Sequence, residues 1–157
     1  MRDESTKQAA QEFLASKLAE EGKKQEDKLN RETAIARSLH VWKMLRDLIF
    51  AQCKEWNNIT QEETLTCKET ALGDVRIWCA ATSKHIVVHF DSSRLIVTIK
   101  NDARDPAQKD AILQIEGYAT ESGRDARLAK NNEPANVPVL VLAELRLLTG
   151  IGAQRSA

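Results

Sequence analysis

The 157-residue sequence predicts an α+β fold, with a long N-terminal helix followed by an antiparallel meander of about six strands and a C-terminal helix. Residues 6–56 contain no proline and are rich in strong helix formers. From residue 64 onward, apolar and polar side chains alternate between short turn signals, as in strands with one buried face. Connections this short join only antiparallel neighbours, so a meander is expected.

The second half of the N-terminal helix carries an apolar stripe. Its seven side chains recur at steps of three and four residues, which places them on one helical face. This half of the helix is therefore expected to pack against the rest of the domain. The stripe consists of Ile35, Leu39, Trp42, Leu45, Ile49, Cys53 and Trp56.

The first half of the helix differs in pattern. Phe13, Leu14 and Leu18 form a short apolar patch, and residues 20–28 are almost wholly charged. Gly22 lies inside the charged run, where glycine costs about 1 kcal/mol relative to alanine. A break or fraying point is therefore expected near residue 22.

The charged run also bears on domain organisation. The heptad spacing of the apolar stripe, extended towards the N-terminus, reaches Lys28 and then Glu21, which opposes a continuous coiled coil. We therefore predict that residues 1–30 form an exposed helical arm, called the arm below. Residues 31–157 are predicted to form a single α+β domain.

Six segments have the alternation and flanking turns of strands. They are residues 64–69, 74–81, 84–90, 94–100, 111–119 and 124–130. In the first meander, one face is apolar and consists of Val75, Ile77, Cys79, Ala81, Ile86, Val88, Phe90, Leu95, Val97 and Ile99. The opposite face, called the mixed face below, consists of Arg76, Trp78, His85, Val87, His89, Ile96 and Thr98.

Residues 137–149 are predicted to form the C-terminal helix. Asn136 is a favourable N-cap, Pro138 fits a first turn, and Gly150 is a typical stop. Because a short apolar run does not by itself distinguish helix from strand, a strand over residues 137–142 remains the alternative.

The composition suits one globular domain and argues against two kinds of partner. The chain is 42% hydrophobic and 29% charged, both ordinary values. Basic and acidic residues number 23 each, whereas nucleic-acid binders usually carry a basic excess that neutralises phosphates. The longest apolar run is too short and too charged to cross a bilayer. Neither a nucleic-acid partner nor a membrane partner is predicted.

Cys53, Cys67 and Cys79 are widely spaced and form no C-x-x-C pair, which argues against a zinc ribbon or a thioredoxin-type motif. Three free thiols are typical of a reducing compartment, and the first 20 residues are too polar for a secretory signal. A cytoplasmic location is therefore expected. Cys79 lies on the apolar strand face and is interpreted as a small buried hydrophobe.

His85 and His89 share a strand face but do not form a metal site by spacing. Four residues of strand span roughly 13 Å, so one ion cannot bind both imidazoles. No serine elbow, phosphate loop or calcium loop is present either. The sequence therefore predicts no metal, no cofactor and no catalytic residue.

Trp78 points away from the apolar strand face, together with Arg76, His85 and His89. Exposed Trp and Arg are typical interface anchors, so these residues are expected to form a binding surface. The alternative is that the arm or the C-terminal helix covers Trp78. The predicted binding residues are Phe13, Leu14, Leu18, Arg76, Trp78, His85 and His89.

Three functional classes remain open. The favoured class is a protein-interaction or assembly module, with a protein partner or self-association through the arm and the mixed face. The alternative is a small-molecule binding domain with a pocket between sheet and helices. The third is an enzyme, in which His89 or His85 would be the default general base because histidine titrates near neutral pH.

Overall fold

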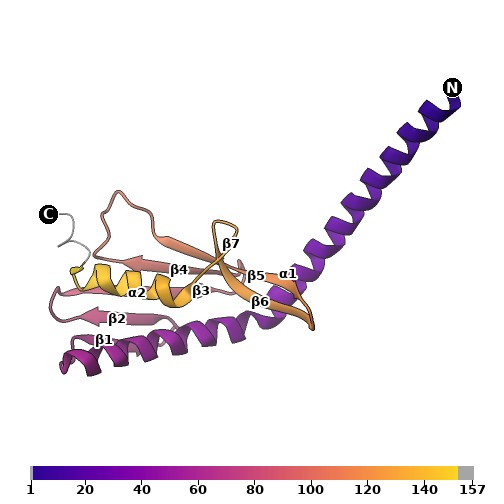
Figure 1. Ribbon diagram of the computed structural model, residues 1–157. Helices are drawn as coiled ribbons and strands as arrows, with labels where there is room; N and C mark the ends of the chain where they lie inside the picture. Colours follow the sequence, from indigo (N-terminus) through magenta and orange to yellow (C-terminus); the bar gives the residue numbers. More distant parts are fainter. Residues whose placement is uncertain (1, 152–157) are drawn as a thin grey trace.

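The computed structural model describes residues 2–151 and has the predicted α+β architecture (Figure 1). A single long helix precedes a seven-stranded antiparallel sheet, and a second helix follows the sheet. In chain order the elements are α1 (Arg2–Thr60), β1 (Leu65–Glu69), β2 (Val75–Cys79), β3 (Lys84–Asp91), β4 (Ile96–Asn101), β5 (Ala111–Thr120), β6 (Gly123–Lys130), β7 (Glu133–Pro134) and α2 (Val137–Leu148).

The sheet is a continuous meander in which each strand pairs with the next, in the order β1 to β7. The six predicted strands are all present, with bounds shifted by a few residues at most. The short β7 is an addition to the six predicted strands. Asn131 and Asn132 take φ values of 53° and 65°, which suit a tight two-residue hairpin turn.

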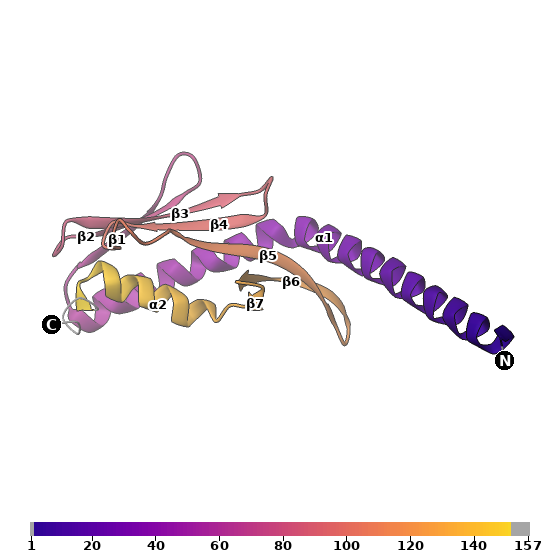
Figure 2. The same ribbon diagram turned by 90° about the horizontal axis from the view of Figure 1, so that it is seen from above.

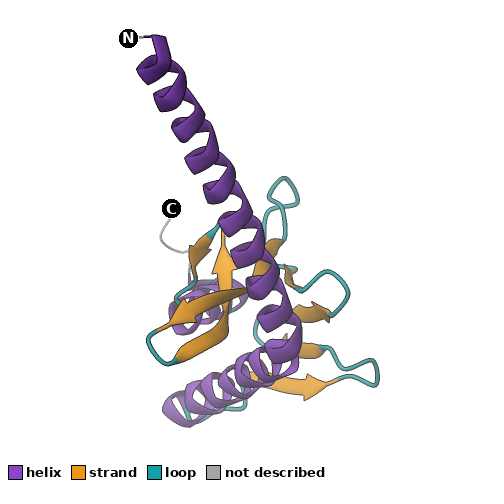
Figure 3. Ribbon diagram, turned by 90° about the vertical axis from the view of Figure 1, so that its right-hand side faces the viewer, coloured by secondary structure: helices purple, strands orange, loops and turns teal. Residues whose placement is uncertain are grey.

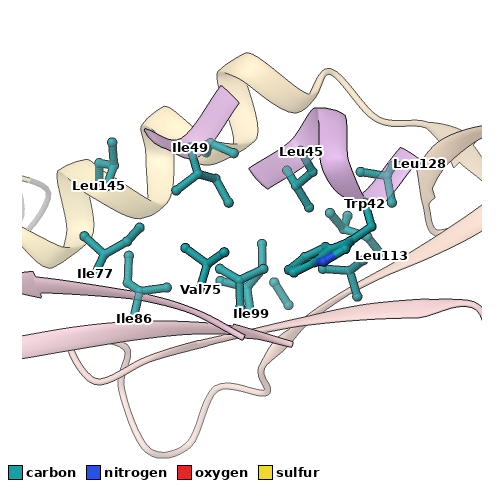
Figure 4. Close-up of a cluster of buried hydrophobic side chains, with 14 of the residues drawn as sticks. Trp42, Leu45, Ile49, Val75, Ile77, Ile86, Ile99, Leu113, Leu128 and Leu145 are labelled. Atoms are coloured by element: carbon teal, nitrogen blue, oxygen red, sulfur yellow. The ribbon is translucent and has the colours of Figure 1, made fainter. Parts of the chain in front are cut away.

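Both helices lie on one face of the sheet, so the domain has two layers (Figure 2). The apolar strand face meets the C-terminal half of α1 and the inner side of α2 in one hydrophobic core (Figure 4). Leu45 and Ile49 of α1, Leu145 of α2 and Ile77 of β2 are almost fully buried there. Trp42 stacks on Phe90 with ring centroids 5.7 Å apart. The mixed face lies on the side of the sheet away from both helices.

Helix α1 is continuous through Gly22, so the expected break near residue 22 was wrong. Glu21, Lys23 and Lys24 around it are strong helix formers. Propagation of an existing helix adds one hydrogen bond per residue fixed, and this gain outweighs the single glycine penalty.

The predicted stripe on α1 was only partly correct. Trp42, Leu45, Ile49 and Cys53 are buried and Trp56 is half-buried. Ile35 and Leu39 are instead exposed, at 53% and 72%. The helix meets the β5–β6 hairpin through smaller neighbours that allow a closer approach. These buried neighbours are Ala34, Ser38 and Val41.

Helix α2 confirms the helical interpretation of its segment and excludes the alternative strand. The side chain of Asn136 accepts a hydrogen bond from the Val139 N–H, which caps the first turn. Gly150 follows the last turn with a φ of 86°, a conformation that glycine adopts without strain. Val141, Leu145 and Leu148 face the sheet.

Candidate interaction surfaces

The arm is a helical rod that projects beyond the β5–β6 hairpin, away from the sheet (Figures 1 and 3). All described side chains from residue 4 to residue 29 are exposed. The predicted apolar patch lies on this rod, with Phe13 at 69%, Leu14 at 56% and Leu18 at 67% exposure. The three side chains therefore expose apolar surface to solvent, on a part of α1 that does not pack against the described hydrophobic core.

The base of the arm is held by the β5–β6 hairpin. Gly117 of β5 lies directly against the main chain of Asn30, where no side chain would fit. The Arg124 guanidinium donates to the side-chain oxygen of Asn30 at 2.6 Å and to a carboxylate oxygen of Glu26 at 2.7 Å. These contacts fix the position and direction of α1 at the point where it leaves the domain.

A second polar contact links the hairpin to α1 about two turns further on. Arg37 Nε lies 3.4 Å from a carboxylate oxygen of Asp125. A hydrogen bond from the Ala126 N–H, together with the nearby Arg37 charge, holds the pKa of Asp125 below its usual value. The contact therefore favours the ionised form of Asp125 beside Arg37.

The mixed face brings together the four predicted binding residues of the sheet. Trp78 of β2 is directly opposite His85 of β3, and Arg76 is opposite Val87. Because both helices lie on the other face, neither α2 nor the described part of the arm covers Trp78, which is 41% exposed. The structure thus gathers these four residues on one open surface, well separated from the arm patch.

The two histidines of the mixed face are tied to different carboxylates. His85 Nδ1 lies 2.6 Å from Asp102, which follows β4, and His89 Nδ1 lies 2.6 Å from Asp74, which precedes β2. Each imidazole is therefore oriented by its own carboxylate. Within residues 2–151, no three His, Cys, Asp or Glu side chains are placed to hold one metal ion.

An open apolar groove of about 610 Å³ lies between α1, β6 and the start of α2. A pocket between sheet and helices was the alternative prediction, but none of these lining residues was predicted, because the groove forms only where three elements distant in the sequence meet. The exposed Met44, on the flank of the apolar stripe, was the one sequence signal for it. We call it the apolar groove; its lining includes Val41, Met44, Leu48, Ala126, Leu128, Val137 and Pro138, with Asp47 and Arg127 as its charged members.

The three cysteines are free thiols. A hydrogen bond between Cys53 of α1 and Cys67 of β1, together with burial, raises the pKa of the Cys53 thiol. Cys79 is fully buried in the core, in the position expected for a small hydrophobe. Cys53 and Cys79 are therefore held as unreactive thiols.

The fold and these surfaces define a two-layer α+β domain with a projecting helix. Comparisons with protein-family models, with curated proteins and with solved structures find no match to this chain. Neither described helix has an apolar stretch long enough to span a membrane.

Proposed function

We propose that this chain is a protein-interaction or assembly module that uses the arm and the mixed face to contact other protein surfaces. The arm carries this proposal. It is a continuous helical extension of the domain, anchored at Glu26 and Asn30, and Phe13, Leu14 and Leu18 are exposed on it. Most helical stability in proteins comes from packing of an apolar face, and this patch packs against no other part of residues 2–151.

The composition of the mixed face also supports a protein partner. Trp and Arg are enriched at the centres of protein interfaces, where they bury large areas and donate hydrogen bonds. Trp78 and Arg76 provide this combination, and the carboxylate-bound His85 and His89 add rigid polar groups beside them. The arm and the mixed face lie on different parts of the molecule, so the module has two separate contact surfaces.

Substitution of Leu14 and Leu18 together by glutamate is expected to weaken association through the arm at least about tenfold, because it places charge in the apolar contact. The stability of the domain should change by less than about 0.5 kcal/mol, since both residues are exposed and touch no core residue. Co-purification of protein with the full chain, quantified by mass spectrometry, measures the first effect. Thermal unfolding by circular dichroism measures the second.

Ala15→Glu is the matched control for this pair of substitutions, because it adds a charge to the same helical turns on another side of α1. It should leave association unchanged. Equal recovery of associated protein by the wild type and by the Leu14→Glu/Leu18→Glu chain would contradict the role of the arm.

A second candidate function, small-molecule binding, rests on the apolar groove. Its volume of about 610 Å³ falls within the range of ligand pockets, and Asp47 and Arg127 supply polar groups at its edge. The groove is distinct from the site expected around Arg76, His85 and His89, which lie on the mixed face. An apolar ligand of drug-like size is the chemistry that the lining favours.

A neutral apolar dye such as Nile red is expected to bind the wild-type chain and to bind Met44→Arg about tenfold more weakly, because the new charge lies on the groove wall. Met44→Leu should keep the affinity. The Leu14→Glu/Leu18→Glu chain should keep it as well, which separates the groove from the arm patch. Fluorescence titration measures the three affinities, and equal binding by Met44→Arg would exclude the groove as the site.

A further inference from the structure

Two pairs of exposed apolar side chains on α1 share one spacing. Leu14 and Leu18 are four residues apart, as are Ile35 and Leu39, and the second pair follows the first by 21 residues. A separation of three heptads keeps both pairs on the same side of a left-handed supercoiled helix pair. On a straight helix the two pairs would be offset by only about 60°.

Both pairs lie on the side of α1 that the domain leaves free. The domain holds α1 through Ala34, Ser38 and Val41, which are buried, whereas Ile35 and Leu39 on the neighbouring side are more than half exposed. The free strip runs from residue 14 to residue 39, a length of roughly 38 Å at 1.5 Å per residue. Along this strip a second helix can lie against α1 without displacing the β5–β6 hairpin.

We propose that a second copy of this chain occupies the strip, with the two α1 helices antiparallel and a two-fold axis beside residues 26–27. This inference rests on the proposed function and names the partner of the arm. In this register Leu14 meets the partner's Leu39, and Leu18 meets the partner's Ile35. The two-fold symmetry repeats both contacts at the other end, so each arm is covered by the domain-bearing half of the other copy.

The charges between the two apolar pairs favour the antiparallel direction. In a parallel pair, Glu21, Lys28 and Glu32 would each face their own copy, giving three like-charge contacts. In the antiparallel pair, Lys28 faces the partner's Gln25, and the like-charge contacts fall from three to two, Glu21 with the partner's Glu32 and its symmetry-related copy. Antiparallel helix dipoles also attract, which adds to the preference.

The apolar surface on the strip is sufficient for a specific dimer. Leu14, Leu18, Ile35 and Leu39 are each more than half exposed, and Phe13 lies beside them. Together the two copies present apolar and flanking surface on the order of 1,000 Å², the size at which specific interfaces begin. The contact is short of an obligate interface, so the dimer is expected to dissociate on dilution.

Light scattering after size-exclusion chromatography of the full chain tests the proposal. The expected mass is twice 17.6 kDa at high concentration, falling towards 17.6 kDa on dilution. The Leu14→Glu/Leu18→Glu chain and the Ile35→Lys/Leu39→Lys chain should each be monomeric, with dissociation constants raised at least about 100-fold. Ala15→Glu should remain a dimer, and circular dichroism checks that every variant is folded.

Mixing the two double variants tests the direction. In the antiparallel dimer, the acidic arm of one chain meets the basic pair of the other, and the remaining arm keeps its apolar contact, so a heterodimer forms. If the two helices were parallel, mixing the double variants would place charged side chains of one chain against apolar side chains of the other at both pairs. No heterodimer would then form. Recovery of the dimer on mixing supports the proposal, whereas a mixture that stays monomeric would overturn the antiparallel register.

A wild-type chain that stays monomeric up to several hundred micromolar would overturn the second copy as the occupant, as would a mass other than that of a dimer. The proposed function is judged separately, by co-purification with the wild-type and the Leu14→Glu/Leu18→Glu chains. If the chain is monomeric but another protein co-purifies with it through the arm, the interaction module is supported and the dimer is contradicted. If the chain is monomeric and co-purification does not depend on the arm, both proposals are contradicted.

Discussion

Glu144→Leu is expected to lower the free energy of unfolding by about 3 kcal/mol, because it leaves the Arg104 guanidinium without its carboxylate in a largely buried site. The Glu144 carboxylate accepts from Arg104 Nη2 at 2.8 and 2.9 Å and from Asn101 Nδ2 at 2.9 Å. Among the described residues, Arg104 Nε has no hydrogen-bond partner, so the guanidinium depends on the Glu144 carboxylate. Urea denaturation followed by circular dichroism measures the change.

The double substitution Glu144→Leu/Arg104→Met separates the unpaired charge from the lost hydrogen bonds. Removing the guanidinium as well should recover more than half of the loss, because apolar replacement of a whole buried ion pair is often close to neutral. A control at Glu62, an exposed residue after α1, should change stability by less than about 0.5 kcal/mol when replaced by leucine. A loss at Glu144 no larger than this would show that the cluster does not stabilise α2 against β4.

Gly117→Ala is expected to lower the free energy of unfolding by about 2–3 kcal/mol, because the new methyl group would overlap the Asn30 carbonyl group and force β5 away from α1. The obstacle is backbone rather than a movable side chain, so local adjustment gives little relief. The displacement should also loosen the contacts of Arg124 with Glu26 and Asn30. Hydrogen exchange around residues 26–38 measures this loosening, and denaturation measures the stability.

Gly22→Ala is the matched control, because it is the same substitution at a helical position with no described neighbour within 4 Å. It should raise stability or leave it unchanged, by up to about 1 kcal/mol, since alanine is the better helix former. A similar loss for both substitutions would show that close packing at Gly117 is not the cause.

The sheet and its order were predictable because the information is local. Turn residues separate six alternating segments, and alternation identifies which side chains face inward, so Val75, Ile77 and Cys79 are buried as expected. The capping role of Asn136 is equally local. The missed strand β7 had a signal as well, since two consecutive asparagines suit a turn in which both central residues have positive φ.

The errors on α1 and the unpredicted lining of the apolar groove have a non-local origin, unlike the correct predictions for the sheet. Periodicity gives the apolar arc of a helix but not which part of that arc meets the sheet, so Ile35 and Leu39 were assigned to the core. Close approach of β5 at Gly117 selects Ala34 instead, and this depends on contacts far apart in the sequence. The predicted binding residues fall on two open surfaces, the arm patch and the mixed face.

The unbroken helix through the boundary of the domain has a mechanical consequence. Leu14 lies 16 residues before Asn30, where the β5–β6 hairpin holds α1. A partner bound at Leu14 is therefore held roughly 24 Å from that contact. A flexible linker would let a bound partner take any orientation relative to the sheet. The continuous helix instead fixes both the direction of the partner and its rotation about the helix axis. Each residue inserted into this stretch of helix would rotate the bound partner by about 100° about the helix axis. The length of the stretch therefore sets the orientation of the partner.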